Sequence, residues 1–84
     1  MENNNKVFEV RCNVFYREYE AEDIHVDSVW TTEEEAIEAA ERIADVEDTF
    51  TFFEKLRRKE TIVWIRVYEK NADGSESYDW ETVF

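Results

Sequence analysis

TTEEEAIEAAERIAD, residues 31–45, is the stretch that decides the fold of this chain. Thr31 and Thr32 are suitable helix N-caps because each is followed three residues later by a glutamate, and early glutamates suit the positive end of a helix dipole. Beyond the caps, apolar residues recur in steps of three and four, which predicts an amphipathic helix. Its apolar stripe consists of Ala36, Ile37, Ala40, Ile43 and Ala44.

The opposite side of this predicted helix is acidic. On a helix, residues three or four apart are neighbours at about 5–6 Å, so these carboxylates form a row whose spacing resembles a row of phosphates. A solvated helix face has the same composition, and the pattern alone does not separate the two interpretations. The row consists of Glu34, Glu38, Glu41 and Asp45.

Two strands are predicted before the helix. Residues 7–19 alternate apolar with polar, which is typical of a half-buried strand. Acidic residues interrupt the pattern at 20–23, and alternation resumes over residues 24–30, which favours a first hairpin. Because successive side chains of a strand point to opposite faces, each strand is predicted to carry its apolar residues on one face. These residues are Phe8, Val10, Cys12, Val14 and Tyr16 in the first strand, and Ile24, Val26, Ser28 and Trp30 share one face in the second.

The sequence after the helix predicts a second hairpin. Residues 48–60 fit either a strand or a helix, and we favour a second helix whose basic end, residues 57–59, pairs with Glu54 and Glu60. Residues 61–69 are rich in β-branched and aromatic side chains and predict a strand. Asp73-Gly74 lies in the turn, residues 71–77, that leads to a last strand over residues 78–84.

These elements predict an α+β fold in one small domain, residues 1–84, with the order ββα(α)ββ. The economical architecture is a mainly antiparallel sheet of about four strands with one or two helices packed on one face. A chain this short buries only about 60% of the surface that its unfolded form exposes, so deep pockets are not expected. Residues 1–5 are predicted to be a flexible N-terminus.

The strand over residues 61–69 is apolar on both faces. Period two places Val63, Ile65 and Val67 on one face, and a single helical layer covers one face only. The other face is then expected to expose aromatic side chains. They either cover one another or form an interface with a partner or a second copy, since Trp, Tyr and Arg are enriched at binding hot spots. This second face carries Ile62, Trp64 and Tyr68 around Arg66, joined by Tyr78 or Trp80.

The composition restricts the classes of function. Lys and Arg number 10 against 22 Asp and Glu, and the net charge is −12, so nucleic acid and anionic membranes are expected to be repelled. A hydrophobic content of 43% predicts a folded domain rather than an acidic tail. The longest apolar run, residues 62–65, is too short to cross a membrane, and the N-terminal residues lack a signal peptide's apolar region. We therefore expect a cytoplasmic protein.

No catalytic or metal-binding set is recognisable. A hairpin turn near residues 21 and 22 would place His25 opposite residues 17–19, on the order of 20 Å from Cys12. One Cys and one His do not make a zinc site, and a chain with 1 glycine has no phosphate-binding loop. We expect no enzymatic activity, no metal and no cofactor.

The sequence therefore favours a non-enzymatic module that binds a protein partner with a basic surface. An acidic mimic of nucleic acid that inhibits a nucleic-acid-binding enzyme, of the phage or mobile-element type, is one form of this hypothesis. The alternative is a homodimer through the aromatic sheet face, with the charge serving solubility. The predicted binding residues are Glu34, Glu38, Glu41 and Asp45, with Glu20, Glu22 and Asp23 near the first hairpin tip, and Trp64 and Tyr68 on the sheet.

Overall fold

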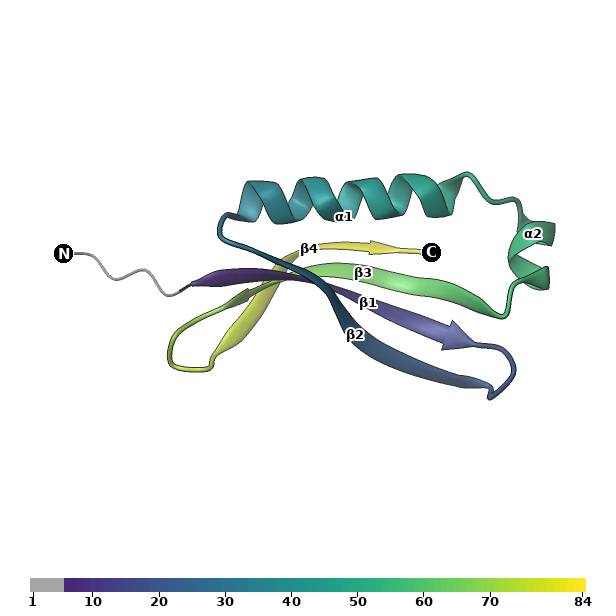
Figure 1. Ribbon diagram of the computed structural model, residues 1–84, viewed down its shortest axis with the longest axis horizontal. Helices are drawn as coiled ribbons and strands as arrows, with labels where there is room; N and C mark the ends of the chain where they lie inside the picture. The colour runs from purple at the N-terminus through teal and green to yellow at the C-terminus, as the bar shows by residue number, and fades with distance from the viewer. Residues whose placement is uncertain (1–5) are drawn as a thin grey trace.

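The computed structural model describes residues 6–84, which form one four-stranded antiparallel sheet and two helices (Figure 1). The predicted α+β class and the order ββααββ are confirmed, and the flexible terminus predicted for residues 1–5 lies outside the described residues. The elements are β1 Val7–Tyr16, β2 Ala21–Trp30, α1 Glu33–Asp48, α2 Phe52–Arg57, β3 Glu60–Lys70 and β4 Glu76–Val83.

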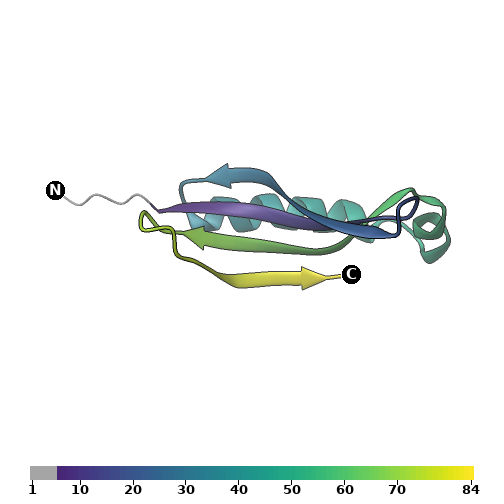
Figure 2. The same cartoon turned by 90° about the horizontal axis from the view of Figure 1, so that it is seen from below.

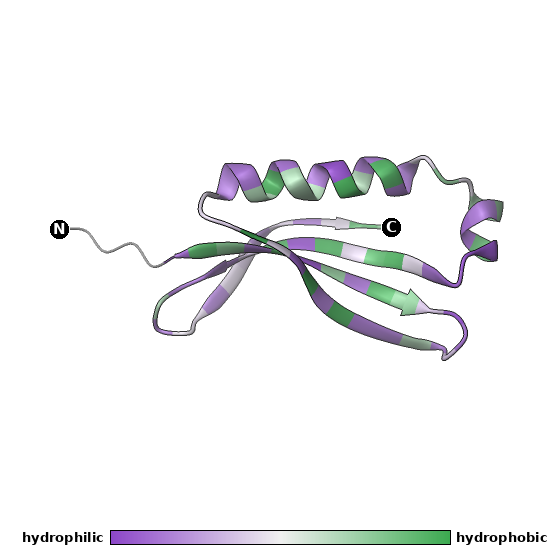
Figure 3. Ribbon diagram, in the orientation of Figure 1, coloured by the Kyte–Doolittle hydropathy of each residue, from purple (hydrophilic) through white to green (hydrophobic). Residues whose placement is uncertain are grey.

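The strand order is β2-β1-β3-β4, with each neighbouring pair antiparallel (Figure 2). One face of the sheet is covered by α1, whereas α2 lies beyond one end of it (Figure 1). Hydrophobic and hydrophilic residues alternate along β1 and β3, as Figure 3 shows, and the hydrophobic set of each strand contacts the helix. The buried core comprises Val10, Cys12, Val14, Ile65 and Val67 from the sheet and Ala36, Ala39 and Ala40 from α1.

The helix α1 begins one residue after Thr32, in agreement with the capping prediction. The Oγ1 atom of Thr32 accepts a hydrogen bond from the backbone N–H of Glu35 at 3.3 Å, which satisfies one of the donors left over at a helix start. Small alanines on the buried side let the helix approach the sheet closely, and both Ala36 and Ala40 are fully buried. The predicted apolar stripe is therefore the side that meets the sheet.

The second helix is confirmed at Phe52–Arg57 and starts with a capping box between Thr51 and Glu54. Its apolar side is not buried, since Phe52 and Phe53 are 70% and 71% exposed. The predicted pairing of its basic end with Glu54 and Glu60 is wrong for Arg58. Arg58 is the C-cap residue of α2, and its guanidinium binds Glu47 of α1 at 3.1 Å.

Three β-bulges change the face on which predicted side chains lie. In each bulge one residue has no opposite partner, so the period of two is shifted by one residue. The bulged residues are Asp27 in β2, Val63 in β3 and Asp79 in β4.

These bulges correct three sequence predictions. Ile62 packs against the core beside α1 and does not share a face with Trp64. Trp80 likewise packs against the core, whereas Tyr78 lies on the other face and contacts the ring of Tyr68. In β2, Trp30 lies on the α1 side, and the registers place Ile24 and Val26 opposite Asn13 and Arg11, on the far side.

Candidate interaction surfaces

The acidic row predicted on α1 lies on the helix surface that faces away from the sheet. We call this row the acidic ridge; it consists of Glu34, Glu38, Glu41 and Asp45, all of which are exposed. The helix has one basic residue, Arg42, and its last turn has none. Within residues 6–84, no ion pair involves a ridge carboxylate. In the described part of the chain, the ridge is therefore a row of carboxylates that no lysine or arginine contacts directly.

One acidic residue of α1 behaves differently. Glu47 is 2% exposed, and its carboxylate accepts two hydrogen bonds from Nη1 of Arg58, at 3.1 and 3.3 Å. The guanidinium of Arg58 also lies over the ring of Phe50, 4.4 Å from its centroid. The sequence contained a sign that Glu47 is buried, because Glu47 follows Ile43 by four positions and so continues the apolar stripe of the helix. A carboxylate at such a position needs a buried cation as partner.

The sheet face away from α1, which we call the open face, is covered by stacked arginines. The guanidinium of Arg66 lies 3.8 Å from the ring centroid of Trp64 and 4.4 Å from that of Tyr78. That of Arg11 lies 4.1 Å from the ring centroid of Tyr68. Because these contacts cover the rings, Trp64 and Tyr68 are only partly exposed. The structure thus brings Trp64 and Tyr68 onto one face, opposite the ridge.

The same arginines hold the acidic residues of the open face. Nη2 of Arg11 lies 2.6 Å from Oε1 of Glu9 and 2.7 Å from Oε2 of Glu76, and Nε of Arg66 lies 2.5 Å from Oε2 of Glu81. The hydrogen bond from Arg11 lowers the pKa of Glu76 below its ordinary value. Three carboxylates of this face are therefore each held by an arginine, with Arg11 contacting two of them.

The acidic residues at the β1–β2 hairpin tip do not join the ridge. Figure 1 shows the hairpin diverging from α1, so that its tip lies away from the outer side of the helix. Glu20 is in the turn with a positive φ of 51°, and Asp23 is exposed on β2. Glu22 lies on the open face, where its Oε1 accepts a hydrogen bond from Nδ2 of Asn13 at 2.8 Å. The predicted binding residues are therefore divided among three separate surfaces.

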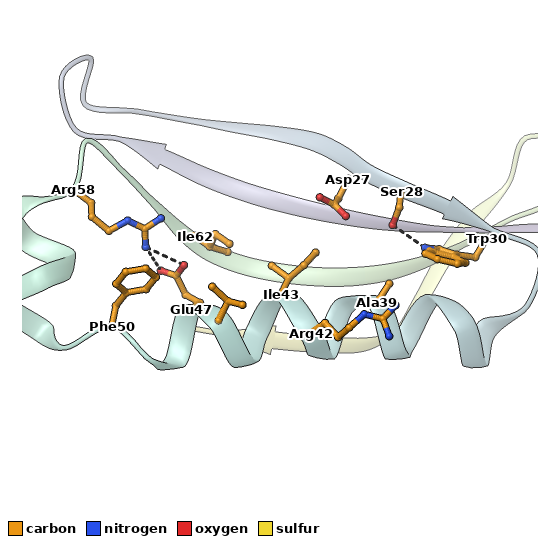
Figure 4. Close-up of a pocket in the computed structure, with 11 residues that line it drawn as sticks. Asp27, Ser28, Trp30, Ala39, Arg42, Ile43, Glu47, Phe50, Arg58 and Ile62 are labelled. Carbon is orange, nitrogen blue, oxygen red and sulfur yellow. Dashed lines mark hydrogen bonds and ion pairs between the residues drawn. The ribbon is translucent and has the colours of Figure 1, made fainter.

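A groove that the sequence did not predict lies between α1 and β2. Figure 4 shows its lining side chains: the helix and the edge strand form the two walls, and β3 lies behind them. Its volume is about 580 Å³. Trp30, Ile43, Val46, Phe50 and Ile62 supply apolar lining, and Asp27, Arg42 and the Glu47–Arg58 pair supply the charges. The groove exists because the bulge in β3 turns Ile62 toward the helix and because the hairpin diverges from α1.

The predicted separation of Cys12 and His25 is wrong. The hairpin turn lies at residues 17–20 rather than at 21 and 22, so β2 begins at Ala21 and His25 is directly opposite Cys12. Burial raises the pKa of the Cys12 thiol to about 11, with a smaller contribution from the charge of Asp27. Since the thiolate is the nucleophilic form, this environment keeps the thiol protonated and unreactive at neutral pH.

Within residues 6–84, no three His, Cys, Asp or Glu side chains are grouped so that they could hold a metal ion. Neither helix in this part of the chain is long and apolar enough to cross a bilayer.

Comparison of the chain with protein-family models, with curated proteins and with solved structures found no match.

Proposed function

We propose that the chain is a non-enzymatic protein-binding module that uses the acidic ridge to dock on a basic protein surface in the cytoplasm. The observation that carries the proposal is that no ion pair within residues 6–84 involves the ridge, although Arg11, Arg58 and Arg66 pair with carboxylates elsewhere. Like charges three and four residues apart destabilise a helix slightly. The helix dipole favours Glu34 in the first turn, but Glu38, Glu41 and Asp45 have no such advantage in the free protein, whereas a cationic partner would convert their repulsion into attraction.

The charge supports a particular class of partner. Electrostatic complementarity accelerates encounter with a basic surface and selects against acidic ones. Basic grooves that bind nucleic acid recognise a row of phosphates, and the ridge presents charges about 5–6 Å apart along a straight helix. We therefore propose a nucleic-acid-binding protein as the partner, with this chain acting as an acidic mimic that inhibits it. An inhibitor of the phage or mobile-element type fits this activity.

The alternative, a homodimer through the aromatic sheet face, is less well supported. The rings of Trp64 and Tyr68 are contacted by Arg66 and Arg11, so a dimer would have to displace or bury these cations. Two chains of net charge −12 also repel each other.

Capture of partners from a lysate at about 0.1 M and about 0.5 M salt tests the proposal, with bound proteins identified by mass spectrometry. We expect a basic partner that is retained at low salt and lost at high salt. A variant carrying Glu34→Lys, Glu38→Lys, Glu41→Lys and Asp45→Lys should lose it. Retention of the partner by this variant contradicts the proposal.

The alternative has its own readout. A homodimer should persist at high salt, because apolar contacts are not screened, and Trp64→Ser should disrupt it. Sedimentation of the wild type as a monomer at both salt concentrations argues against the dimer.

A further inference from the structure

The strand β2 is an edge strand whose outer side carries no neighbour. The sheet order places β2 beside β1 alone, and within residues 6–84 no other strand pairs with it (Figure 2). It is ten residues long, and most of its residues are exposed. A long exposed edge offers a row of backbone N–H and C=O groups that can bind another strand.

Apolar surface flanks this edge on both faces of the sheet. On the open face, Ile24, Val26 and Val29 are 55%, 47% and 55% exposed. On the α1 side, the edge borders the groove described above, whose rim includes Val46, itself 60% exposed. A strand added beside β2 would place alternate side chains on these two surfaces, because successive side chains of a strand point to opposite faces. The edge therefore offers backbone partners and apolar contacts together.

The charge of the edge selects the kind of strand. Glu22, Asp23 and Asp27 lie on β2, whose only cationic group is the imidazole of His25 when protonated. None of these three acidic residues forms an ion pair within the described chain. A second copy of β2 would bring its own three carboxylates to the edge, which disfavours self-pairing. A strand carrying Lys or Arg would neutralise them.

We propose that β2 and the groove beside it form a second binding site, which accepts an extended partner segment of alternating apolar and basic residues as a fifth strand. This mode, β-strand addition, takes its affinity from main-chain hydrogen bonds and its selectivity from side-chain pockets. The site is distinct from the acidic ridge and does not depend on it. With its apolar side chains on the open face, beside Ile24, Val26 and Val29, the added strand places its basic side chains on the α1 side, near Asp23 and the groove residue Asp27.

The probe for this site is an acetylated and amidated peptide in which valine and lysine alternate over eight residues. Its control replaces the two central valines by proline, which keeps the charge and removes strand pairing. At about 0.3 M salt, where unspecific attraction is screened, we expect the valine–lysine peptide to bind and to slow hydrogen exchange at amides of β2. Equal binding of the proline peptide, or no slowing in β2 at millimolar peptide, overturns the proposal.

Matched substitutions locate the site on the protein. Val26→Ser and Val29→Ser, both on the open face, should each weaken peptide binding about fivefold, the loss expected when a valine can no longer be buried. Val83→Ser is the control, because Val83 is 64% exposed on β4, the opposite edge. An equal loss of peptide affinity in the Val83 variant overturns the proposal. Slower hydrogen exchange in β2 at higher protein concentration, without peptide, also overturns it, because the edge would then bind a second copy of the chain.

The test is separable from the function proposed for the ridge. A variant with Glu34→Gln, Glu38→Gln, Glu41→Gln and Asp45→Asn should still slow exchange in β2 when the peptide is added. Loss of that protection in this variant contradicts the independence of the two sites. If the ridge binds no partner, the proposal for the ridge fails, but the expected slowing of hydrogen exchange in β2 by the peptide is unchanged.

Discussion

The outer side of α1 and the open face of the sheet both carry several carboxylates, but of these two regions only the open face has carboxylates in ion pairs within residues 6–84. Glu9, Glu76 and Glu81 each contact an arginine, and those arginines also cover aromatic rings. The carboxylates of the ridge have no such partners within the described chain. Within residues 6–84, no carboxylate of the ridge forms an ion pair, whereas the open face contains three that do.

The largest stability effect is expected where a carboxylate of α1 is paired. Glu47→Ala removes the partner of Arg58 in a nearly buried ion pair, and we expect a loss of about 2 kcal/mol in the free energy of unfolding. The estimate lies below that for fully buried pairs because the Arg58 side chain is 33% exposed. Glu41→Ala on the ridge is the control and should change stability by less than about 0.5 kcal/mol. Urea unfolding measures the stability of both variants. Equal losses of stability would contradict the difference between the paired Glu47 and the unpaired ridge.

A loss of about 1 kcal/mol is expected for Arg66→Ala on the open face. The substitution removes a cation that stacks on Trp64 and Tyr78 and that binds Glu81. Arg42→Ala is the matched control, because Arg42 forms no ion pair within residues 6–84 and should be nearly neutral for stability. A loss in the Arg42 variant as large as that for Arg66 would show that the stacking adds nothing.

Neutralising part of the ridge should stabilise the protein. In the variant Glu38→Gln, Glu41→Gln and Asp45→Asn, the three repulsive neighbour pairs of the ridge (34/38, 38/41 and 41/45) are removed, and an aspartate near the negative end of the helix dipole is lost. We expect a gain of about 0.5 kcal/mol at low salt that disappears at about 0.5 M salt. Thermal unfolding at both salt concentrations measures it. A salt-independent loss of stability would indicate that the ridge carboxylates have partners that hold the fold.

The smallest effect concerns the pH dependence of one paired carboxylate. Because Arg11 holds the pKa of Glu76 below its ordinary value, ionised Glu76 stabilises the folded state at neutral pH. This contribution is fully present above the unfolded-state pKa, roughly 4.3, and is lost as the pH falls through the lower folded-state pKa. The stability difference between wild type and Glu76→Gln should therefore shrink between pH 5 and pH 3. A difference that stays constant over this range contradicts the assignment.

Much of the fold was predictable because the local signals agree with one another. The capping threonine, the glutamates of the first turn and the spacing of Ala36 and Ala40 all indicate the same helix, and α1 follows them. The strand periods likewise place Val10, Cys12 and Val14 in the core. Where hydrophobic pattern, capping and turn residues coincide, little tertiary information is needed.

The faces on which several side chains lie, and the groove, depend on how the strands pair. The hydrophobic pattern of one strand carries no information about that pairing. The bulges at Asp27, Val63 and Asp79 have no signature in the sequence, and each moves its neighbours to the other face. A shift of the hairpin turn by a few residues likewise brought His25 opposite Cys12. The groove beside α1 depends on the bulge in β3, which turns Ile62 toward the helix, so the pattern of the single strands could not predict it.

The measurement that tests the central claim most directly compares two isosteric variants in binding to the captured basic partner. One removes four charges from the ridge, by Glu34→Gln, Glu38→Gln, Glu41→Gln and Asp45→Asn. The other removes four from the hairpin tip, by Glu18→Gln, Glu20→Gln, Glu22→Gln and Asp23→Asn. Titration calorimetry at several salt concentrations gives the affinity and its salt dependence.

We predict that the ridge variant binds at least about tenfold more weakly at 0.1 M salt, with a flatter salt dependence, and that the tip variant stays within about twofold of the wild type. Equal losses in the two variants would show that total charge, and not the uncompensated helix face, determines binding, and would contradict the account.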